Sequence, residues 1–464
     1  MARYSAHTPQ ELQDMLGTLG LSKLEDLYQE IPDELKLQGE LNLHQGLSLL
    51  DLEQLFDNLA SGNMQPNIVL RGAGAYKHFI PPLCKTVPSK ESFLSSYTPY
   101  QAEASQGVLQ SIFEFQTMIC ELTGMDLANA SLYDGAEAAA EASSMCVDKK
   151  RSKTLVSAGL NPAYIETIKT YAFGRGHELE LIDLKDGRTD LEALKKALED
   201  PQVASVIVQQ PNYFGHLEEA KEIGALVKEA GAAYIMCVNP IAQAVLETPK
   251  DCHADICVGE GQPLGLALGF GGPYLGFMSC NESYLRKIPG RIVGKTTDLD
   301  GKEAFVLTLQ AREQHIRREK AGSNVCTNQA LCALTAAVYM ASMGPQGMKS
   351  AAELSYYRAH KLAQRLCSYE GFELLSQGEF FHEFLTSKPE FYAELEAFLA
   401  ERRILPGLAL DEGVLWCATE CFTEQQEQEF FEELDAFYAM KAQEPQLEEL
   451  LKAMAAQDNK GDQD

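Results

Sequence analysis

Residues 203–238 read VASVIVQQPNYFGHLEEAKEIGALVKEAGAAYIMCV. The stretch begins with a mostly apolar, β-branched run at 203–209, which is typical of a buried strand. Helix-forming residues follow at 218–230, and a second apolar run closes the stretch at 233–238. Because a helix between two buried strands is typical of a right-handed crossover, we predict that the two strands are parallel neighbours in one sheet.

The same alternation continues on both sides of this unit. We expect further strands at 154–156, 178–182, 254–258 and 276–279, and helices at 105–123, 136–146, 161–171 and 189–198. Short apolar strands that alternate with helices predict an α/β fold, with a mostly parallel sheet that is covered by helices on both faces.

The two ends of the chain have a different pattern. Residues 1–62 contain no strand pattern, and Thr8 and Ser48 are expected to cap the first and the third of three helices. Residues 281–320 are basic and irregular, and an Ala-rich helix is expected at 324–343. Later strands are expected at 372–375 and 414–418. The predicted parts are an N-terminal helical segment at 1–62, a large α/β domain at 63–320, a linking helix with a small α+β domain at 321–454, and an acidic tail at 455–464.

The composition excludes several classes of protein. The chain has 464 residues, of which 45% are hydrophobic and 23% charged, as is ordinary for a globular protein. Its formal net charge of −28 disfavours binding to nucleic acid or to an anionic membrane. No apolar run is long enough to span a bilayer, and the N-terminus does not resemble a secretory signal. The 12 scattered cysteines are typical of buried thiols in a reducing compartment, so we expect a cytoplasmic location.

Two motif-like segments do not support the chemistry that they suggest. Residues 290–296 (GRIVGKT) nearly spell a phosphate-binding loop, but only three residues separate the glycines where four are required. Residues 251–255 gather Asp, Cys and His, yet no second pair of ligands follows at the spacing of a zinc site. We therefore predict neither nucleotide hydrolysis nor a metal site.

The densest basic run lies at 312–320, where three arginines and one lysine stand within nine residues of an otherwise acidic chain. A polar cluster at 323–328 follows, next to the expected start of the Ala-rich helix near Asn324. Arginines, hydroxyls and a helix N-terminus together favour an anion site. A solvated helix face with ion pairs four residues apart explains the same run equally well, so both interpretations stay open.

Three loops are rich in glycine or aromatic residues. They are 71–76 (RGAGAY), 97–101 (YTPYQ) and the glycine-rich stretch 266–276. Glycine lets a backbone approach a ligand or another chain closely, but it also permits tight bends between strands. Each loop alone is weak evidence for a pocket or an interface.

Taken together, four segments resemble one known family. They are 97–101 (YTPYQ), 116–125 (QTMICELTGM), 129–135 (NASLYDG) and the basic run with its polar cluster at 312–328. They look like the amino-terminal half of glycine decarboxylase, the P-protein of the glycine cleavage system, and the resemblance runs from about residue 3 to 450. This family has one-chain and two-chain forms, and a chain of this length resembles subunit 1 (alpha) of the two-chain form. The resemblance implies fold type I of the pyridoxal-phosphate (PLP) enzymes, as in aspartate aminotransferase.

Two chemical groups on which PLP depends in such enzymes are missing from their expected places. One is an Asp at a strand end, which keeps the pyridine nitrogen protonated, and the other is a Lys after the next strand, which holds PLP as a Schiff base. The first place falls near Cys237 or Asn239, and the second falls near Gln262 or Pro263. We therefore expect that this chain does not itself hold PLP covalently.

The resemblance implies an oxidoreductase, glycine dehydrogenase (decarboxylating, aminomethyl-transferring), that is active only as a complex with subunit 2 (beta), in an α2β2 heterotetramer. Subunit 2 is expected to carry PLP, and the complex is expected to decarboxylate glycine and pass the aminomethyl group to the lipoyl arm of the carrier H protein. This chain is expected to complete the active site. The candidates are Ser323, Asn324 and Thr327 for the phosphate of the partner's PLP, Arg312, Arg317 and Arg318 to support them or to meet an acidic carrier, and Tyr97, Tyr100, Gln101 and Tyr133 for the pocket or tunnel.

Two alternatives stay open. The first is a degenerate subunit of the same fold that only stabilises its partner and docks the carrier, without contributing to the active site. The second is a self-sufficient PLP enzyme that uses Lys320. This residue stands in a charged helical run rather than after a strand, which makes the second alternative the weaker one.

Overall fold

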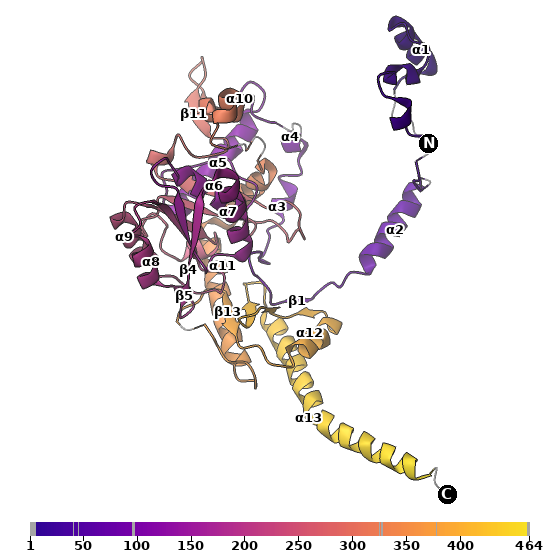
Figure 1. The fold of residues 1–464 in the computed structure, drawn as a ribbon, viewed down its shortest axis with the longest axis vertical. Coiled ribbons are helices and arrows are strands. Elements are labelled where there is room, and N and C mark those ends of the chain that lie inside the picture. Colours follow the sequence, from indigo (N-terminus) through magenta and orange to yellow (C-terminus); the bar gives the residue numbers. More distant parts are fainter. Residues whose placement is uncertain are drawn as a thin grey trace. The chain divides into compact units, whose positions relative to one another are not determined.

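The computed structural model describes residues 6–39, 41–44, 46–94, 98–323, 325, 328–376 and 378–461, with side chains described as far as residue 443. The chain divides into two compact units, Met1–Met64 and Gln65–Asp464, and Figure 1 shows the elements of each. No helix in this described part of the chain is both long enough and apolar enough to cross a bilayer.

The first unit is helical, as the sequence predicts, and it has almost no core. Its elements are α1 (Pro9–Thr18), the 3-10 turns η1 (Leu24–Tyr28) and η2 (Asp33–Leu35), and α2 (Leu49–Ser61). The predicted caps are both present, because the hydroxyls of Thr8 and Ser48 accept hydrogen bonds from the first turns of α1 and α2. Among the described residues of this unit, Leu16 is the only buried hydrophobic side chain.

The second unit is built on a seven-stranded sheet of order β2-β10-β9-β8-β7-β3-β4. The strands are β2 (Leu127–Ala128), β3 (Lys153–Ser157), β4 (Glu178–Ile182), β7 (Val203–Gln210), β8 (Ala233–Val238), β9 (Ile256–Glu260) and β10 (Gly276–Cys280). Six of them run in the same direction, and β10 alone is antiparallel to both of its neighbours. Residues 203–238 form β7, a helix and β8, and the two strands pair in parallel. The mostly parallel sheet is thus confirmed.

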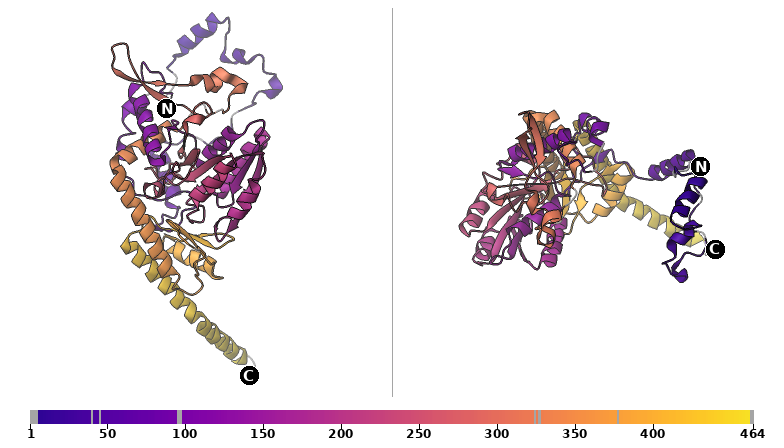
Figure 2. Two further views of the ribbon diagram at one scale, coloured as in Figure 1. Left: turned by 90° about the vertical axis from the view of Figure 1, so that its left-hand side faces the viewer. Right: turned by 90° about the horizontal axis from the view of Figure 1, so that it is seen from above.

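Helices cover both faces of this sheet (Figures 1 and 2). They are α5 (Gln106–Thr123), α6 (Gly135–Cys146), α7 (Pro162–Arg175), α8 (Leu191–Ala197), α9 (Ala220–Glu229) and α11 (Ala330–Leu366). Side chains alternate along β7, so Val206 and Val208 pack in the cluster with α5, α9 and α11, whereas Ile207 packs in the cluster with α6 and α7. The two clusters form the core on the two faces of the sheet.

The C-terminal part of the second unit has its own sheet and core. Its elements are β13 (Glu383–Thr386), α12 (Tyr392–Glu401), β14 (Ile404–Leu405), β15 (Leu408–Ala409), β16 (Val414–Cys417) and α13 (Glu424–Gly461). β13, β16 and β15 form an antiparallel sheet, and β14 pairs with β1 (Ile68–Val69). Trp416 lies fully buried in an aromatic cluster that also includes residues from the second half of α11.

The remaining elements of the second unit are short. They are α3 (Leu83–Thr86), α4 (Glu91–Leu94), the β5 (Leu184–Lys185) and β6 (Arg188–Thr189) pair, η3 (Ala242–Ala244), η4 (Glu282–Tyr284), the hairpin β11 (Val293–Thr297) and β12 (Glu303–Leu307), η5 (Gln310–Arg312), α10 (Gln314–Arg317) and η6 (Arg318–Lys320).

Three sequence predictions about these elements are wrong. Residues 372–375 form no strand, and Leu374 makes only an isolated bridge to Thr386, which belongs to the strand that the sequence missed. Residues 281–320 are not irregular throughout, because they contain the β11–β12 hairpin. The Ala-rich helix begins at Ala330 rather than near Asn324, and it continues to Leu366 across a kink at Gly344, which precedes a proline.

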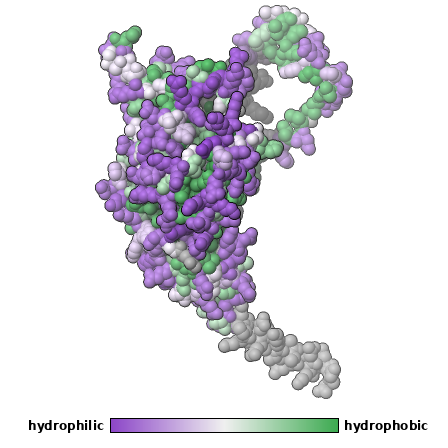
Figure 3. All heavy atoms as spheres, turned by 60° about the vertical axis from the view of Figure 1, so that its left-hand side comes forward, coloured by the Kyte–Doolittle hydropathy of each residue, from purple (hydrophilic) through white to green (hydrophobic). Residues whose placement is uncertain are grey.

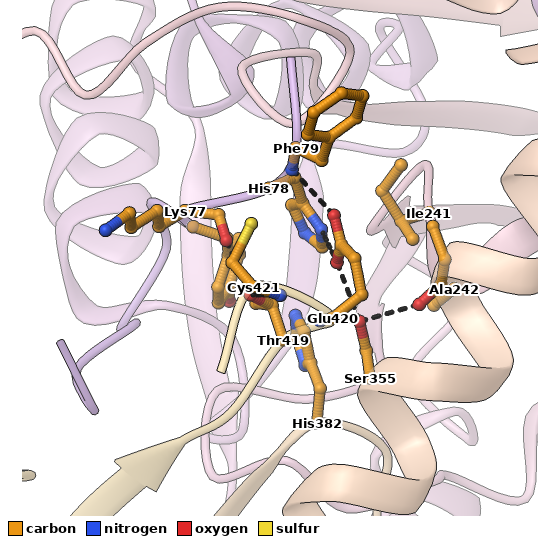
Figure 4. A network of polar contacts seen from close by, with 12 residues as sticks. Lys77, His78, Phe79, Ile241, Ala242, Ser355, His382, Thr419, Glu420 and Cys421 are labelled. Carbon is orange, nitrogen blue, oxygen red and sulfur yellow. Dashed lines mark hydrogen bonds and ion pairs between the residues drawn. The ribbon is translucent and has the colours of Figure 1, made fainter. Parts of the chain in front are cut away.

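A buried polar network joins three segments of the second unit that are far apart in the sequence (Figure 4). The Glu420 carboxylate lies 2.7 Å from His78 Nδ1, and it accepts hydrogen bonds from Phe79 N at 2.7 Å and from the Ser355 hydroxyl at 3.1 Å. Burial alone would raise the pKa of Glu420, but the contacts with His78 and the Phe79 N–H outweigh it and lower the pKa. The network connects the segment before α3 and the C-terminal sheet to α11.

Candidate functional site

A small pocket lies at the carboxyl ends of β3, β7, β8 and β9, which is where open parallel sheets bind their ligands. Its lining residues are Gly74, Tyr76, Asn161, Tyr164, Gln209, Cys237, Val238, Asn239, Gly259, Glu260 and Pro263. The places where the sequence lacks an Asp and a Lys therefore meet at this pocket. The pocket volume is about 30 Å³, which has room for ordered water but not for a larger ligand.

Gln262 lies beside this pocket, at the place where PLP enzymes of this fold are expected to carry the lysine that binds PLP. Its side chain is 1% exposed, and its Oε1 accepts a hydrogen bond from Tyr76 N at 2.8 Å. Its Nε2 donates to Tyr76 O at 2.9 Å and to Leu266 O at 2.8 Å. The amide is thus used to hold the loop at 71–76 against the end of the sheet.

Glu260, the last residue of β9, occupies the start of α6. Its carboxylate accepts hydrogen bonds from Gly135 N at 3.0 Å, Gln262 N at 2.9 Å and Leu275 N at 2.9 Å. The N–H groups at a helix N-terminus are the usual donors to a bound anion. Burial raises the pKa of Glu260 to about 7, although these three donors act in the opposite direction. An internal carboxyl group therefore uses a donor that would otherwise be available to a phosphate.

Tyr164 fills the remaining space between α7 and the start of α6. A Cβ atom at Gly135 would come within 2.1 Å of the Tyr164 hydroxyl and within 2.9 Å of Glu260 N, so the contact leaves no room for another group. The described lining of the pocket has neither a lysine nor an aspartate, Glu260 occupies the Gly135 N–H at the start of α6, and the pocket volume is far below that of a cofactor. The residues present do not fit PLP.

A second, larger concavity lies near the predicted basic run. We call it the basic groove, and it comprises two adjoining cavities of about 1190 and 270 Å³. Its charged and polar lining includes Arg175, Arg286, Lys287, Arg291, Arg312, Arg317, Arg318, Lys320, His177, His315, Glu141, Glu313 and Ser323. In a chain of net charge −28, such a concentration of cations favours an anionic ligand or partner surface.

A buried carboxylate pair on α6 lies at the basic groove, and Glu141 is the member of the pair that lines it. Glu141 accepts a hydrogen bond from the Ser323 hydroxyl at 2.8 Å and lies 3.3 Å from Arg175 Nη2. Glu137 stands one turn earlier, and burial together with the charge of Glu141 raises its pKa to about 8. A carboxyl group whose pKa is raised by burial, close to an arginine-lined cavity, makes this region a candidate functional site.

The predicted arginines have different environments in the groove. Arg312 is half-buried, and its guanidinium donates to the main-chain oxygens of Ile288 and Gly290, so it stabilises the groove rather than offering charge to a ligand. Arg317 and Arg318 are exposed, and no ion pair is formed by either within the described residues. Of the three predicted arginines, these two therefore keep their charge available.

The other predicted residues are only partly brought together. The Arg291 guanidinium lies 5.0 Å from the ring of Tyr100, which places Tyr100 beside the groove. Tyr133 is 41% exposed and its N–H donates to the Glu137 carboxylate, whereas exposed Gln101 lines neither cavity. Ser323 lines the groove, but it is seven residues before the start of α11 and not at a helix N-terminus. The predictions for Tyr97, Asn324 and Thr327 lie outside the described residues.

Sequence reasoning missed several polar residues of this region. These are Glu137, Glu141 and Arg175. Asn328, the last residue of the predicted polar cluster, is 8% exposed, and neither polar atom of its amide is bonded in the described structure. Two carboxylates four residues apart in an otherwise Ala-rich buried helix were the available signal for the first pair. No group of three or more His, Cys, Asp and Glu residues in the described ranges is arranged to hold a metal ion.

Comparison with known proteins identifies the family that the sequence resembles. Residues 2–431 match the family model described as glycine cleavage system P-protein. A relative from Desulfitobacterium hafniense, named probable glycine dehydrogenase (decarboxylating) subunit 1, is 45% identical over 91% of this chain and 97% of its own length. A relative of the same name from Carboxydothermus hydrogenoformans is 47% identical over 87% of this chain and 91% of its own length.

Solved structures agree with these relatives. A crystal structure of glycine decarboxylase (P-protein) of the glycine cleavage system, in inhibitor-bound form, matches with a TM-score of 0.87 and 38% identity, over 93% of this chain and 99% of that chain. A sphingosine-1-phosphate lyase from Burkholderia pseudomallei and a glutamate decarboxylase from Lactobacillus brevis match with TM-scores of 0.63 and 0.64, at 14% and 12% identity. At such identities the likeness concerns the fold alone, and it confirms the predicted PLP-enzyme fold type I.

Proposed function

The chain belongs to the glycine cleavage system P-protein family, and from this premise we propose that it is the subunit of glycine dehydrogenase (decarboxylating) that completes a shared active site without holding PLP. Its role as subunit 1 of that enzyme follows from the relatives, which it matches over nearly their whole length. The closed pocket at Gln262 and Glu260 is the single observation that carries the rest of the proposal.

The closed pocket supports our proposal that the other subunit holds PLP. PLP belongs to the glycine dehydrogenase system, because the matched folds are those of PLP enzymes. When bound, it supplies the electron sink that glycine decarboxylation requires. Since the described lining of this chain's pocket has no lysine, has an internal carboxylate on the Gly135 N–H and encloses almost no volume, subunit 2 is the chain that holds PLP in our proposal.

The name subunit 1 implies a second subunit, and we propose an α2β2 assembly. The complex decarboxylates glycine and transfers the aminomethyl group to the lipoyl arm of the H protein. The free thiols of all described cysteines support the cytoplasmic location that we propose for it.

The contribution of this chain to the shared site comes from the basic groove and its neighbours. Ser323, Asn324 and Thr327 stay our candidates for contact with the phosphate of the partner's PLP. The unbonded amide of Asn328 supports the assignment of this segment to a ligand contact, because a buried amide without partners costs free energy in the isolated chain. Arg317 and Arg318 offer positive charge at the exposed side of the same groove.

The test is the location of PLP in the purified complex of both full-length subunits. Borohydride reduction fixes PLP to the lysine that holds it, and peptide mass spectrometry then identifies the chain. We expect the pyridoxyl label on subunit 2 alone, together with glycine-dependent release of CO2 by the complex and none by this chain. A pyridoxyl-lysine in this chain would overturn the proposal.

A second measurement separates an active-site role from the purely structural alternative. Thr327→Val is nearly isosteric and removes one hydroxyl. If this segment reaches the partner's PLP, the variant complex loses PLP more readily, by about 1–3 kcal/mol of binding free energy. Unchanged PLP affinity in an intact complex would favour the scaffold alternative.

A further inference from the structure

The N-terminal unit exposes far more apolar surface than its size can account for. Half of the large hydrophobic side chains that are exposed in the described chain belong to the first 64 residues. Among the described residues of this unit, Leu16 is the only buried hydrophobic residue, and α2 contains no buried residue. Figure 3 shows hydrophobic residues along this unit that face outwards. A segment of about 60 residues without a core does not stabilise itself.

The exposed side chains of α2 form an ordered stripe. Leu49, Leu52, Phe56 and Leu59 follow one another at spacings of three and four residues, so they share one face of the helix. They are 72%, 40%, 61% and 62% exposed. Gln54 and Asn58 stand on the opposite face. A 13-residue helix with one continuous apolar face, capped at its start by Ser48, is shaped to pack against another surface.

The charge of the N-terminal unit limits which surface the apolar stripe of α2 can pack against. The first 64 residues contain eleven acidic and three basic residues, and the chain as a whole has a net charge of −28. A second copy of this chain is therefore strongly acidic as well, and like charges oppose such a contact. The basic groove offers positive charge, but its lining is mostly charged and polar and does not match a stripe of Leu and Phe. A different chain is the better occupant.

The family supplies that different chain. The matched family model begins at residue 2, so the apolar segment belongs to the part of the chain that this family shares and is not an appended tail. Relatives that match over this length are named subunit 1, which implies a second subunit. Permanent complexes bury large and mainly apolar interfaces, of roughly 2,000–5,000 Å², and the exposed leucines of this unit are suited to such an interface.

We propose that residues 1–64 form an arm that packs on subunit 2, with the apolar stripe of α2 in an apolar groove whose rim carries Lys or Arg. This proposal rests on the proposed function, because it requires the second subunit. It adds the surface by which this chain recognises that subunit.

The test uses the co-expressed, full-length pair of subunits. Leu52→Glu combined with Phe56→Glu places two charges in the apolar stripe, and Gln54→Glu combined with Asn58→Glu places the same two charges on the opposite face as a matched control. Sedimentation velocity over a concentration series gives the dissociation constant between the subunits, and thermal unfolding of the lone chain reports on its stability. Because α2 has no buried residue within the N-terminal unit, and because we propose that its stripe packs on subunit 2, neither variant should alter that stability.

We expect the stripe variant to weaken association with subunit 2 by about tenfold or more, and the control variant to change it by less than about threefold. An active wild-type pair whose association is unaffected by the stripe variant would overturn the proposal alone. The proposal would also be overturned if the stripe variant lowered only the thermal midpoint of the lone chain, because the arm would then pack on its own chain. It would likewise be overturned if the variant weakened only the self-association of this chain, because the arm would then pack on a second copy. A wild-type pair that neither associates nor decarboxylates glycine would overturn the proposed function together with the arm.

Discussion

The side chain of Gln262 holds the main chain of Tyr76 at two points, accepting from its N–H at 2.8 Å and donating to its carbonyl oxygen at 2.9 Å. The two residues are 186 positions apart, so the contact joins the loop at 71–76 to the end of the central sheet. The buried side-chain amide thus pairs with the main chain of Tyr76 in the way that two neighbouring β-strands pair, and both of its polar groups are satisfied. The position beside the missing lysine is therefore a structural one in this chain.

The first prediction concerns the stability that this contact provides. Gln262→Met keeps the length of the side chain but leaves Tyr76 N, Tyr76 O and Leu266 O without their partner. Unsatisfied buried groups cost about 1–3 kcal/mol each, with partial relaxation, so we expect the free energy of unfolding to fall by about 2–4 kcal/mol in urea titrations.

A matched control is available in the same protein. Gln243 is also buried, at 4% exposure, but neither polar atom of its side chain has a partner in the described structure. Gln243→Met should therefore be neutral or stabilising, because it removes polar atoms that gain nothing from burial. Equal losses in the two variants would show that packing, and not the contact with Tyr76, accounts for the role of Gln262.

The second prediction concerns restoration of the missing lysine. Gln262→Lys should not create a PLP enzyme, because the pocket volume stays near 30 Å³ and Glu260 still uses the donor at the start of α6. We expect the lone variant to show no pyridoxyl adduct after incubation with PLP and borohydride, and a lower thermal midpoint than the wild type. An adduct on the introduced lysine would contradict our account of the closed pocket.

Much of the fold could be predicted from the sequence, because the buried parallel strands are continuous apolar runs. β7 and β8 follow this rule. β13 does not, since it begins with Glu383, a carboxyl group that is 2% exposed and is held by Tyr76 OH and Ala73 N from more than 300 residues away. The hairpin strand β11 was missed for the opposite reason, because most of its side chains are exposed and carry no alternation.

The candidate site was predictable in the groups that it lacks and, in part, in its basic residues. The absence of Lys and Asp at the strand ends is visible in the sequence, but the closure of the pocket depends on contacts of Gln262, Glu260 and Tyr164 across long sequence separations. The basic run was visible as well. Its division into structural Arg312 and exposed Arg317 and Arg318 depends on the carbonyl oxygens of a separate loop, which composition does not indicate.

The third prediction concerns pH and Glu137. Burial and the charge of Glu141 raise the pKa of Glu137 to about 8 in the folded chain, from a reference value of 4.5. Between these two values the folded state binds more protons than the unfolded state, so this group makes the free energy of unfolding fall as the pH rises from about 4.5 to about 8. Glu137→Gln cannot ionise and should remove this part of the pH dependence.

We therefore expect the Glu137→Gln variant to be more stable than the wild type at pH 9 by about 1–3 kcal/mol, and similar to it near pH 5. Urea titrations over this pH range provide the measurement. Glu121→Gln, on the exposed side of α5, is the control and should leave the pH dependence unchanged. Parallel pH profiles for the wild type and Glu137→Gln would mean that Glu137 is ionised in the folded chain at neutral pH.

The last prediction concerns the exposed charge of the basic groove. Arg317→Ala combined with Arg318→Ala removes two adjacent cations that line the groove, whereas Lys149→Ala combined with Lys150→Ala removes two adjacent exposed cations outside its lining. If the groove receives an acidic carrier, the double arginine variant should raise the KM of the assembled complex for the H protein by about threefold to tenfold at low salt, with kcat nearly unchanged. The reason is that exposed charges mainly increase the rate at which two proteins associate. The difference in KM between the wild type and the variant should decrease as the salt concentration rises, because salt screens the attraction between the exposed arginines and the acidic carrier. The lysine pair should leave KM unchanged. A normal KM combined with faster loss of PLP from the complex would instead assign these arginines to the partner's phosphate, and no change in either quantity would remove them from the functional site.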